Sequence, residues 1–157
     1  RQFLAQMPVV LQSPSGPAPP GKTRYLAFAG DSTLFPNGQS VRLRDVLDGT
    51  SNTLTFVRSA PAAAVEWMKP ADLDFDVERP FAGLESPQGY FLATFCDGSV
   101  RRISLAIDEA EMRALVTRDN GEPIDRRALD APPAQPADLD LVPIDAVDAY
   151  DAVEEAN

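Results

Sequence analysis

The sequence predicts an α+β fold, with a mostly antiparallel β-sheet and one packed helix. Three observations carry this prediction. The runs YFLATF and VRRI are rich in β-forming residues and flank the turn sequence CDGS, as expected of a hairpin. TLTFVRS alternates well enough to form another strand, and an amphipathic stretch follows Asp108. Strands that precede one helix are typical of α+β proteins.

The hairpin prediction depends on the pair Asp97-Gly98. Asp-Gly is expected to supply the positive-φ positions of a tight turn between two strands. Ser99 follows the pair, and the β-rich runs on either side are then expected to pair with each other.

The helix has a predicted start and a predicted end. Asp108 is the expected N-cap, with Glu111 three residues later as in a capping box. Ile107 and Met112 can form a hydrophobic staple across this cap. Gly121 is expected to close the helix.

The other stretches are less regular. Residues 25–29 are apolar and aromatic and are followed by glycine, which is typical of a strand. Residues 41–47 are expected to form a strand or a short helical turn. Residues 1–12 could hold the end of a helix broken at Pro8. Residues 60–89 are rich in Pro and acids, so regular structure is expected to be sparse there.

Charge divides the chain into two parts. The chain has 157 residues, which suits one domain, and a net charge of −10. All 14 Lys and Arg lie at or before Arg127, with 16 of the 24 acids, so residues 1–127 are nearly neutral. We expect residues 1–127 to form a β-rich globular domain and residues 128–157 to form an acidic Pro/Ala/Asp linker and tail.

The end of the tail leaves two alternatives open. IDAVDAYDAVEEAN could form a small acidic helix with Ile144, Val147 and Tyr150 on one side, docked on the body or on a partner. Alternatively it is a disordered tail, since an isolated helix this short is marginal in water.

GPAPPGKT, residues 16–23, matches the phosphate-loop pattern G-x-x-x-x-G-K-[ST]. A working loop points successive backbone N–H groups at the phosphates and leads into a helix. Here three of the four variable positions are proline, which has no N–H, and a strand-like stretch follows. We therefore interpret the match as coincidental and expect no nucleotide binding.

Composition excludes several kinds of site. The chain has no histidine and one cysteine, Cys96, which removes Ser-His-Asp and Cys-His catalysis and histidine metal sites. DLDFD begins like a calcium loop, but Val77 and Gly83 stand where glycine and glutamate are needed, so an acidic surface turn is favoured over a weak calcium site. The body has no basic excess for nucleic acid. We expect no catalytic residue, no cofactor, no metal and no nucleic-acid partner.

Four stretches in order resemble one protein family. They are LDGTSNTLTFV (47–57), AVEWMKPADLDFD (64–76), FCDGSVRRI (95–103) and IDEAEMRALVTRDNGEPID (107–125). With these motifs the chain resembles the family called domain of unknown function 1559, which is abundant in planctomycete bacteria. The resemblance covers residues 3–125 and not the acidic tail.

The resemblance implies a role and a location. Full-length members start with a prepilin-type leader and a long apolar helix, like pseudopilins of type II secretion (protein G-like). The chain therefore resembles the C-terminal globular part of such a protein, with any membrane contact made through an upstream helix. The family implies an extracytoplasmic, cell-envelope protein without enzymatic activity, which acts through protein partners in a larger envelope or filament assembly. Many members carry a histidine before the hairpin, where this chain has Ser86 and Pro87.

The motif residues are interpreted as fold determinants. The two Asp-Gly pairs form turns, the polar residues after the first pair can hydrogen-bond to local backbone, and the proline of AVEWMKP fixes an extended kink. The set is Asp48, Gly49, Thr50, Ser51, Asn52, Thr53, Trp67, Pro70, Asp97, Gly98 and Ser99.

A second hypothesis is a soluble extracytoplasmic module that binds a glycan or a peptide. It predicts a concave site near Trp67, Phe81 or Tyr90, although the setting of Trp67 in AVEWMKP favours a packing anchor. An enzyme is a third hypothesis and would need a cleft that holds carboxylates with shifted pKa values.

Overall fold

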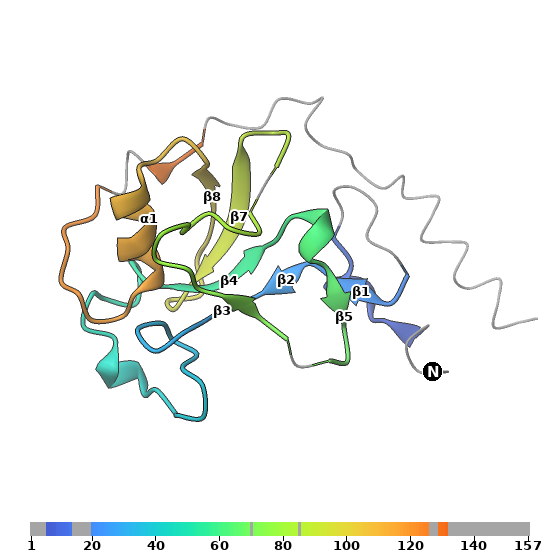
Figure 1. The fold of residues 1–157 in the computed structure, drawn as a ribbon, viewed down its shortest axis with the longest axis horizontal. Helices are drawn as coiled ribbons and strands as arrows, with labels where there is room; N and C mark the ends of the chain where they lie inside the picture. The colour runs from blue at the N-terminus through green and yellow to red at the C-terminus, as the bar shows by residue number, and fades with distance from the viewer. Residues whose placement is uncertain (1–5, 14–19, 70, 85, 126–128, 132–157) are drawn as a thin grey trace, which may run out of the picture.

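The computed structural model describes residues 6–13, 20–69, 71–84, 86–125 and 129–131. These residues form an α+β fold with mostly antiparallel strands and one α-helix, as the sequence predicts (Figure 1). The main sheet has four antiparallel strands in the order β2-β4-β7-β8. Their bounds are Tyr25–Leu26 (β2), Leu54–Arg58 (β4), Tyr90–Phe95 (β7) and Val100–Ser104 (β8).

Shorter paired segments surround the main sheet. They are β1 (Lys22–Thr23) antiparallel to β5 (Val65–Glu66), and β3 (Phe28–Ala29) parallel to β6 (Leu73–Asp74). The predicted strand at 25–29 is thus present as β2 and β3, which have different partners.

Single 3-10 turns complete the described chain. They lie at Val9–Leu11, Leu43–Asp45 and Pro61–Ala63. Residues 41–47 therefore contain a helical turn, one of the two predicted alternatives. The prediction of sparse regular structure between residues 60 and 89 is confirmed.

β7 and β8 form the predicted hairpin, but its turn differs from the expected one. The Gly98 N–H donates to the Phe95 carbonyl and the Phe95 N–H donates to the Ser99 carbonyl, both at 2.9 Å, which makes a three-residue loop. Gly98 has φ 83°, and no non-glycine residue of the described chain has a positive φ. The prediction of a positive φ at Asp97 is therefore wrong. Its carboxylate instead accepts hydrogen bonds from the Ser99 N–H (2.9 Å) and hydroxyl (2.6 Å).

The helix α1 (Glu109–Val116) begins where the sequence predicts. The Asp108 carboxylate caps it by accepting a hydrogen bond from the Glu111 N–H at 2.7 Å. Ile107 and Met112, the predicted staple pair, are both buried in the core cluster.

The end of α1 differs from the prediction. Thr117 already has an extended backbone, so Gly121 does not close the helix. The next residue gives the reason, because the Arg118 N–H donates to the Ser32 carbonyl (3.1 Å) in a distant loop. A tertiary hydrogen bond therefore ends the helix before its sequence signal is reached.

The core lies between α1 and one face of the main sheet, the inner face. Met112, Leu115 and Val116 of the helix belong to its buried cluster. Fully burying such a side chain stabilises the fold by roughly 1.5–3 kcal/mol. The strands contribute Leu54, Val57, Phe91, Ala93, Phe95 and Ile103. The opposite face, the open face, carries the alternate residues of the same strands.

Residues 129–131 lie along the edge of β8. Leu129 is fully buried in the core, and Asp130 forms an antiparallel bridge with Ile103. The Ala131 N–H donates to the Arg102 carbonyl at 3.0 Å. The packed body therefore extends past the predicted boundary at residue 127, to residue 131 at least. The remainder of the predicted tail, 132–157, lies outside the described residues.

Leu129→Ala tests this packing. Removal of a fully buried leucine side chain is expected to lower the free energy of unfolding by about 2–5 kcal/mol. Leu43→Ala, at an exposed leucine, is the matched control and is expected to change it by less than about 0.5 kcal/mol. Urea unfolding of the full chain, followed by circular dichroism, measures both. Equal effects would show that residues 129–131 do not pack on the body.

Candidate functional site

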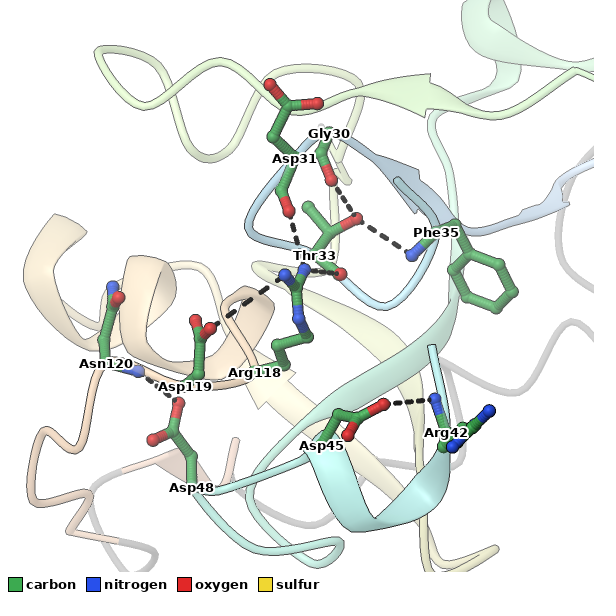
Figure 2. A network of polar contacts seen from close by, with 10 residues as sticks. All are labelled: Gly30, Asp31, Thr33, Phe35, Arg42, Asp45, Asp48, Arg118, Asp119 and Asn120. Atoms are coloured by element: carbon green, nitrogen blue, oxygen red, sulfur yellow. Dashed lines mark hydrogen bonds and ion pairs between the residues drawn. The ribbon is translucent and has the colours of Figure 1, made fainter. Parts of the chain in front are cut away.

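Arg118 joins the chain after α1 to two loops (Figure 2). One guanidinium nitrogen donates to the carbonyls of Asp31 and Thr33, both at 2.6 Å. The Arg118 carbonyl accepts hydrogen bonds from the N–H groups of Leu47 (2.7 Å) and Asp48 (3.2 Å). These bonds hold both loops against the end of α1.

Asp48 anchors the same region through its side chain. Its carboxylate accepts hydrogen bonds from the N–H groups of Asn120 (3.1 Å) and Gly121 (2.6 Å), more than 70 residues along the chain. The Asn52 amide donates to the Asp48 carbonyl (2.9 Å), and Gly49 between them has φ 92°, a conformation that glycine adopts without strain. Asp48 therefore closes its own turn and holds the segment after α1.

The two Asp-Gly turns are bonded to each other. The Asp97 N–H donates to the Thr50 carbonyl and the Cys96 N–H donates to the Thr53 carbonyl, both at 3.0 Å. The Thr53 side chain is fully buried, and its hydroxyl donates to the Gly49 carbonyl (3.2 Å). The turn of residues 48–53, with Ser51 half-buried within it, thus fastens the hairpin tip to the loop before β4.

The open face carries exposed apolar side chains at one end of the main sheet. Phe56, Thr94 and Val100 lie side by side, because the register pairs Phe56 with Thr94 and Thr94 with Val100. The ring of Phe35 packs against that of Phe56, with centroids 5.9 Å apart. Phe35, Phe56 and Val100 are 37%, 46% and 64% exposed, and Leu43 is 66% exposed. We call Phe35, Leu43, Phe56 and Val100 the apolar surface.

A hollow of about 270 Å³ adjoins this surface at Phe35 and Leu43. Cys96 is half-buried in its wall, where the Thr55 hydroxyl contacts the Cys96 Sγ at 3.6 Å. The register of β4 shifts between Leu54 and Phe56, which makes Thr55 the extra residue of a bulge. The lining residues are Leu34, Phe35, Val41, Arg42, Leu43, Val46, Thr55 and Cys96.

A second hollow, of about 350 Å³, lies next to the first and shares Val41 with it. Its charged lining residues form pairs, Arg44 with Asp45 at 3.8 Å and Arg118 with Asp119 at 3.9 Å. Each cation of this hollow therefore already has an anion close by, and the lining does not select a charged ligand.

Trp67, Phe81 and Tyr90, the predicted ligand contacts, line neither hollow. Tyr90 is buried at the start of β7, and Phe81 is half-buried against the core. Trp67 is half-buried just after β5. Pro70, another predicted motif residue, lies outside the described residues.

Two acids of DLDFD accept hydrogen bonds within the fold. Asp72 accepts a hydrogen bond from the Ala27 N–H (3.2 Å), and Asp76 accepts from the Glu78 N–H (3.0 Å) and the Arg79 guanidinium (2.8 Å). The hydrogen bond from Arg79 lowers the pKa of Asp76. In the part of the chain that the structure describes, His, Cys, Asp and Glu side chains do not gather in threes around a metal position.

The phosphate-loop match leads into a strand. Lys22 and Thr23, its last two residues, form β1 instead of the start of a helix. The prediction of strand structure after the match is confirmed, and residues 14–19 lie outside the described chain.

The fold and the site define an α+β protein with an apolar surface on the open face of an antiparallel sheet. No family model matches the chain, and neither a curated protein nor a solved structure does. Over the described ranges, none of the helices is long and apolar enough to cross a membrane.

The sequence contained only part of the signal for the apolar surface. Regular alternation in TLTFVRS would place Leu54 and Phe56 on the same face. The bulge at Thr55 instead leaves Leu54 in the core and Phe56 exposed. Because the bulge depends on pairing with β7, residue patterns within β4 do not reveal it.

Asp48→Ala tests the anchor of the chain after α1. Loss of the two hydrogen bonds to Asn120 and Gly121 is expected to lower the free energy of unfolding by about 1–2 kcal/mol, and to speed amide hydrogen exchange at both residues. Asp119→Ala is the control, because among the described residues its carboxylate makes only a long, exposed ion pair with Arg118. Its effect is expected to stay within about 0.5 kcal/mol. Unchanged exchange at Asn120 and Gly121 in Asp48→Ala would rule out the anchor.

Proposed function

We propose that the chain is a non-enzymatic structural or assembly protein of the cell envelope, a pilin- or pseudopilin-like subunit that acts through protein–protein contacts. The observation that carries the proposal is the apolar surface of Phe35, Leu43, Phe56 and Val100, which are all exposed on one side of the sheet. Large apolar side chains that gather on one face are typical of sites where another protein docks.

The hollow favours a protein partner over a small molecule. Its volume of about 270 Å³ is at the small end of the roughly 300–1,000 Å³ of most small-molecule sites. A space of this size accommodates one anchoring side chain, such as a leucine or phenylalanine of a partner, while the exposed rings beside it widen the contact.

The resemblance to the domain of unknown function 1559 family supports the same proposal. Its motifs meet in the structure, since the turn of 48–53 bonds both to the hairpin tip at 96–97 and to the chain after α1. Proteins that share these motifs would share these contacts between the turn, the hairpin tip and the chain after α1. By that resemblance the subunit is extracytoplasmic, and an upstream helix would make its membrane contact.

Charge placed on the apolar surface tests the proposal. Leu43→Asp combined with Phe56→Asp is expected to release the subunit from its assembly, because each carboxylate would be buried without a partner in the contact. Native gel electrophoresis of gently solubilised envelope fractions measures this. The wild-type chain should migrate in a complex much larger than a monomer, and the double variant as a monomer.

Met68→Asp combined with Val77→Asp is the matched control, because both side chains are exposed and lie outside the apolar surface. Assembly is expected to persist in this control, and circular dichroism should show both double variants folded. A monomeric wild-type chain in its native envelope would overturn the proposal. The module that binds a glycan or peptide would then be the better hypothesis.

A further inference from the structure

We propose that the apolar surface is covered in the free subunit by the acidic C-terminal segment of the same chain, residues 144–155. The inference rests on the proposed function, since it names what a protein partner must displace from that surface. Three features carry it: the path of the chain at residue 131, the residue pattern of the segment, and the charges around the apolar surface.

The described chain ends beside the apolar surface. Asp130 and Ile103 form an antiparallel bridge, and the Ala131 N–H donates to the Arg102 carbonyl (3.0 Å). Because the bridge is antiparallel, the step from Asp130 to Ala131 runs along the β8 edge toward Val100. Val100 belongs to the apolar surface, so the last described step of the chain points toward that surface.

Asp130 and Leu129 anchor the end of the described chain to the body. The Asp130 Oδ1 accepts hydrogen bonds from the Arg101 Nη2 (2.7 Å) and Nε (3.0 Å). The preceding Leu129 is fully buried in the core. Two neighbouring residues thus fix the point from which residues 132–143 lead to the acidic segment.

The segment has a repeat of three residues: an apolar residue, an acid, and then alanine or a second acid. If the segment binds with about three residues per turn, this period places the apolar residues in one line and the acids in a line beside it. Such a pattern suits a surface with an apolar centre and a basic border. The four repeats are Ile144-Asp145-Ala146, Val147-Asp148-Ala149, Tyr150-Asp151-Ala152 and Val153-Glu154-Glu155.

The apolar surface has such a border. Arg42 lines its hollow, Arg44 is exposed in the same turn, and Arg102 lies on the open face two residues from Val100. Asp45 offsets part of this charge, since its carboxylate accepts from the Arg42 N–H (2.9 Å) and lies 3.8 Å from the Arg44 Nε. An exposed pair such as Arg44–Asp45 contributes at most about 1 kcal/mol, so carboxylates of the segment can compete for Arg44.

Tethering favours the same chain over a second copy. Residues 132–143, which join Ala131 to the segment, can span at most about 40 Å. A short tether gives an effective concentration on the order of millimolar. The segment of a second copy would reach the same concentration at the surface only if the protein itself were at a similar concentration.

A spin label at the end of the chain locates the segment. The full chain carries Cys96→Ala, which removes the one native cysteine, and Asn157→Cys with a nitroxide. At low salt we expect the label to broaden the amide signals of Phe35, Leu43 and Phe56, and not that of Val77. Added salt should reduce the broadening, because it screens the ion pairs.

Substitutions in the segment supply the comparison. Asp145→Asn, Asp148→Asn and Asp151→Asn together are expected to abolish the broadening. Asp138→Asn with Asp140→Asn, outside the repeats, is the control and should keep it. The reactivity of the Cys96 thiol gives a second measurement, made on chains that retain Cys96 and carry no spin label. The Cys96 thiol of the triple variant should react with a thiol reagent roughly tenfold faster than that of the wild-type chain. This factor is expected if the segment covers the hollow about nine-tenths of the time.

Two results would overturn the inference. One is the absence of broadening at the apolar surface. The other is equal broadening when unlabelled ¹⁵N chains are mixed with spin-labelled ¹⁴N chains, which would assign the surface to the segment of a second copy. Neither result affects the assembly experiment in the envelope. Conversely, a monomeric native protein with a docked segment would overturn the proposed function alone.

Discussion

The arrangement of this protein depends on the hydrogen bonds that the turn of residues 48–53 makes with two distant segments. The carbonyls of Thr50 and Thr53 bond to the hairpin tip, and the Asp48 carboxylate bonds to the chain after α1. A loop that leaves water must satisfy its backbone groups inside the body. These bonds do so here, and they fix where the hairpin, the helix end and the loop before β4 lie relative to one another.

The position of the apolar surface depends on these hydrogen bonds. The turn at Leu43–Asp45 lies between loops that Arg118 and Asp48 hold in place, which leaves a hollow beside the open face of the sheet. Its exposed side chains therefore project from fixed backbone. A partner that docks on a fixed surface loses less conformational entropy on binding than one that must order a loop.

An exposed apolar surface is also a hazard, because chains can associate through it without control. In the proposed arrangement, the acidic segment of residues 144–155 reduces this hazard. Its five acids, without a basic residue, correspond to half of the net charge of −10, which disfavours contact between copies, and its apolar residues can cover the surface from the same chain. A partner would then have to bind more tightly than the tethered segment.

The sequence by itself determined the strand pairing of the hairpin, the start of α1 at Asp108 and the sparse structure between residues 60 and 89. Each depends on residues a few positions apart, such as Asp108 and Glu111, which the sequence displays directly. Only the tertiary structure decided where α1 ends, which face of the sheet exposes Phe56, and that Leu129 belongs to the core. These outcomes depend on partners far along the chain, because a loop carbonyl ends the helix, pairing with β7 makes the bulge, and the edge of β8 receives residues 129–131. No pattern within one segment encodes contacts of that kind.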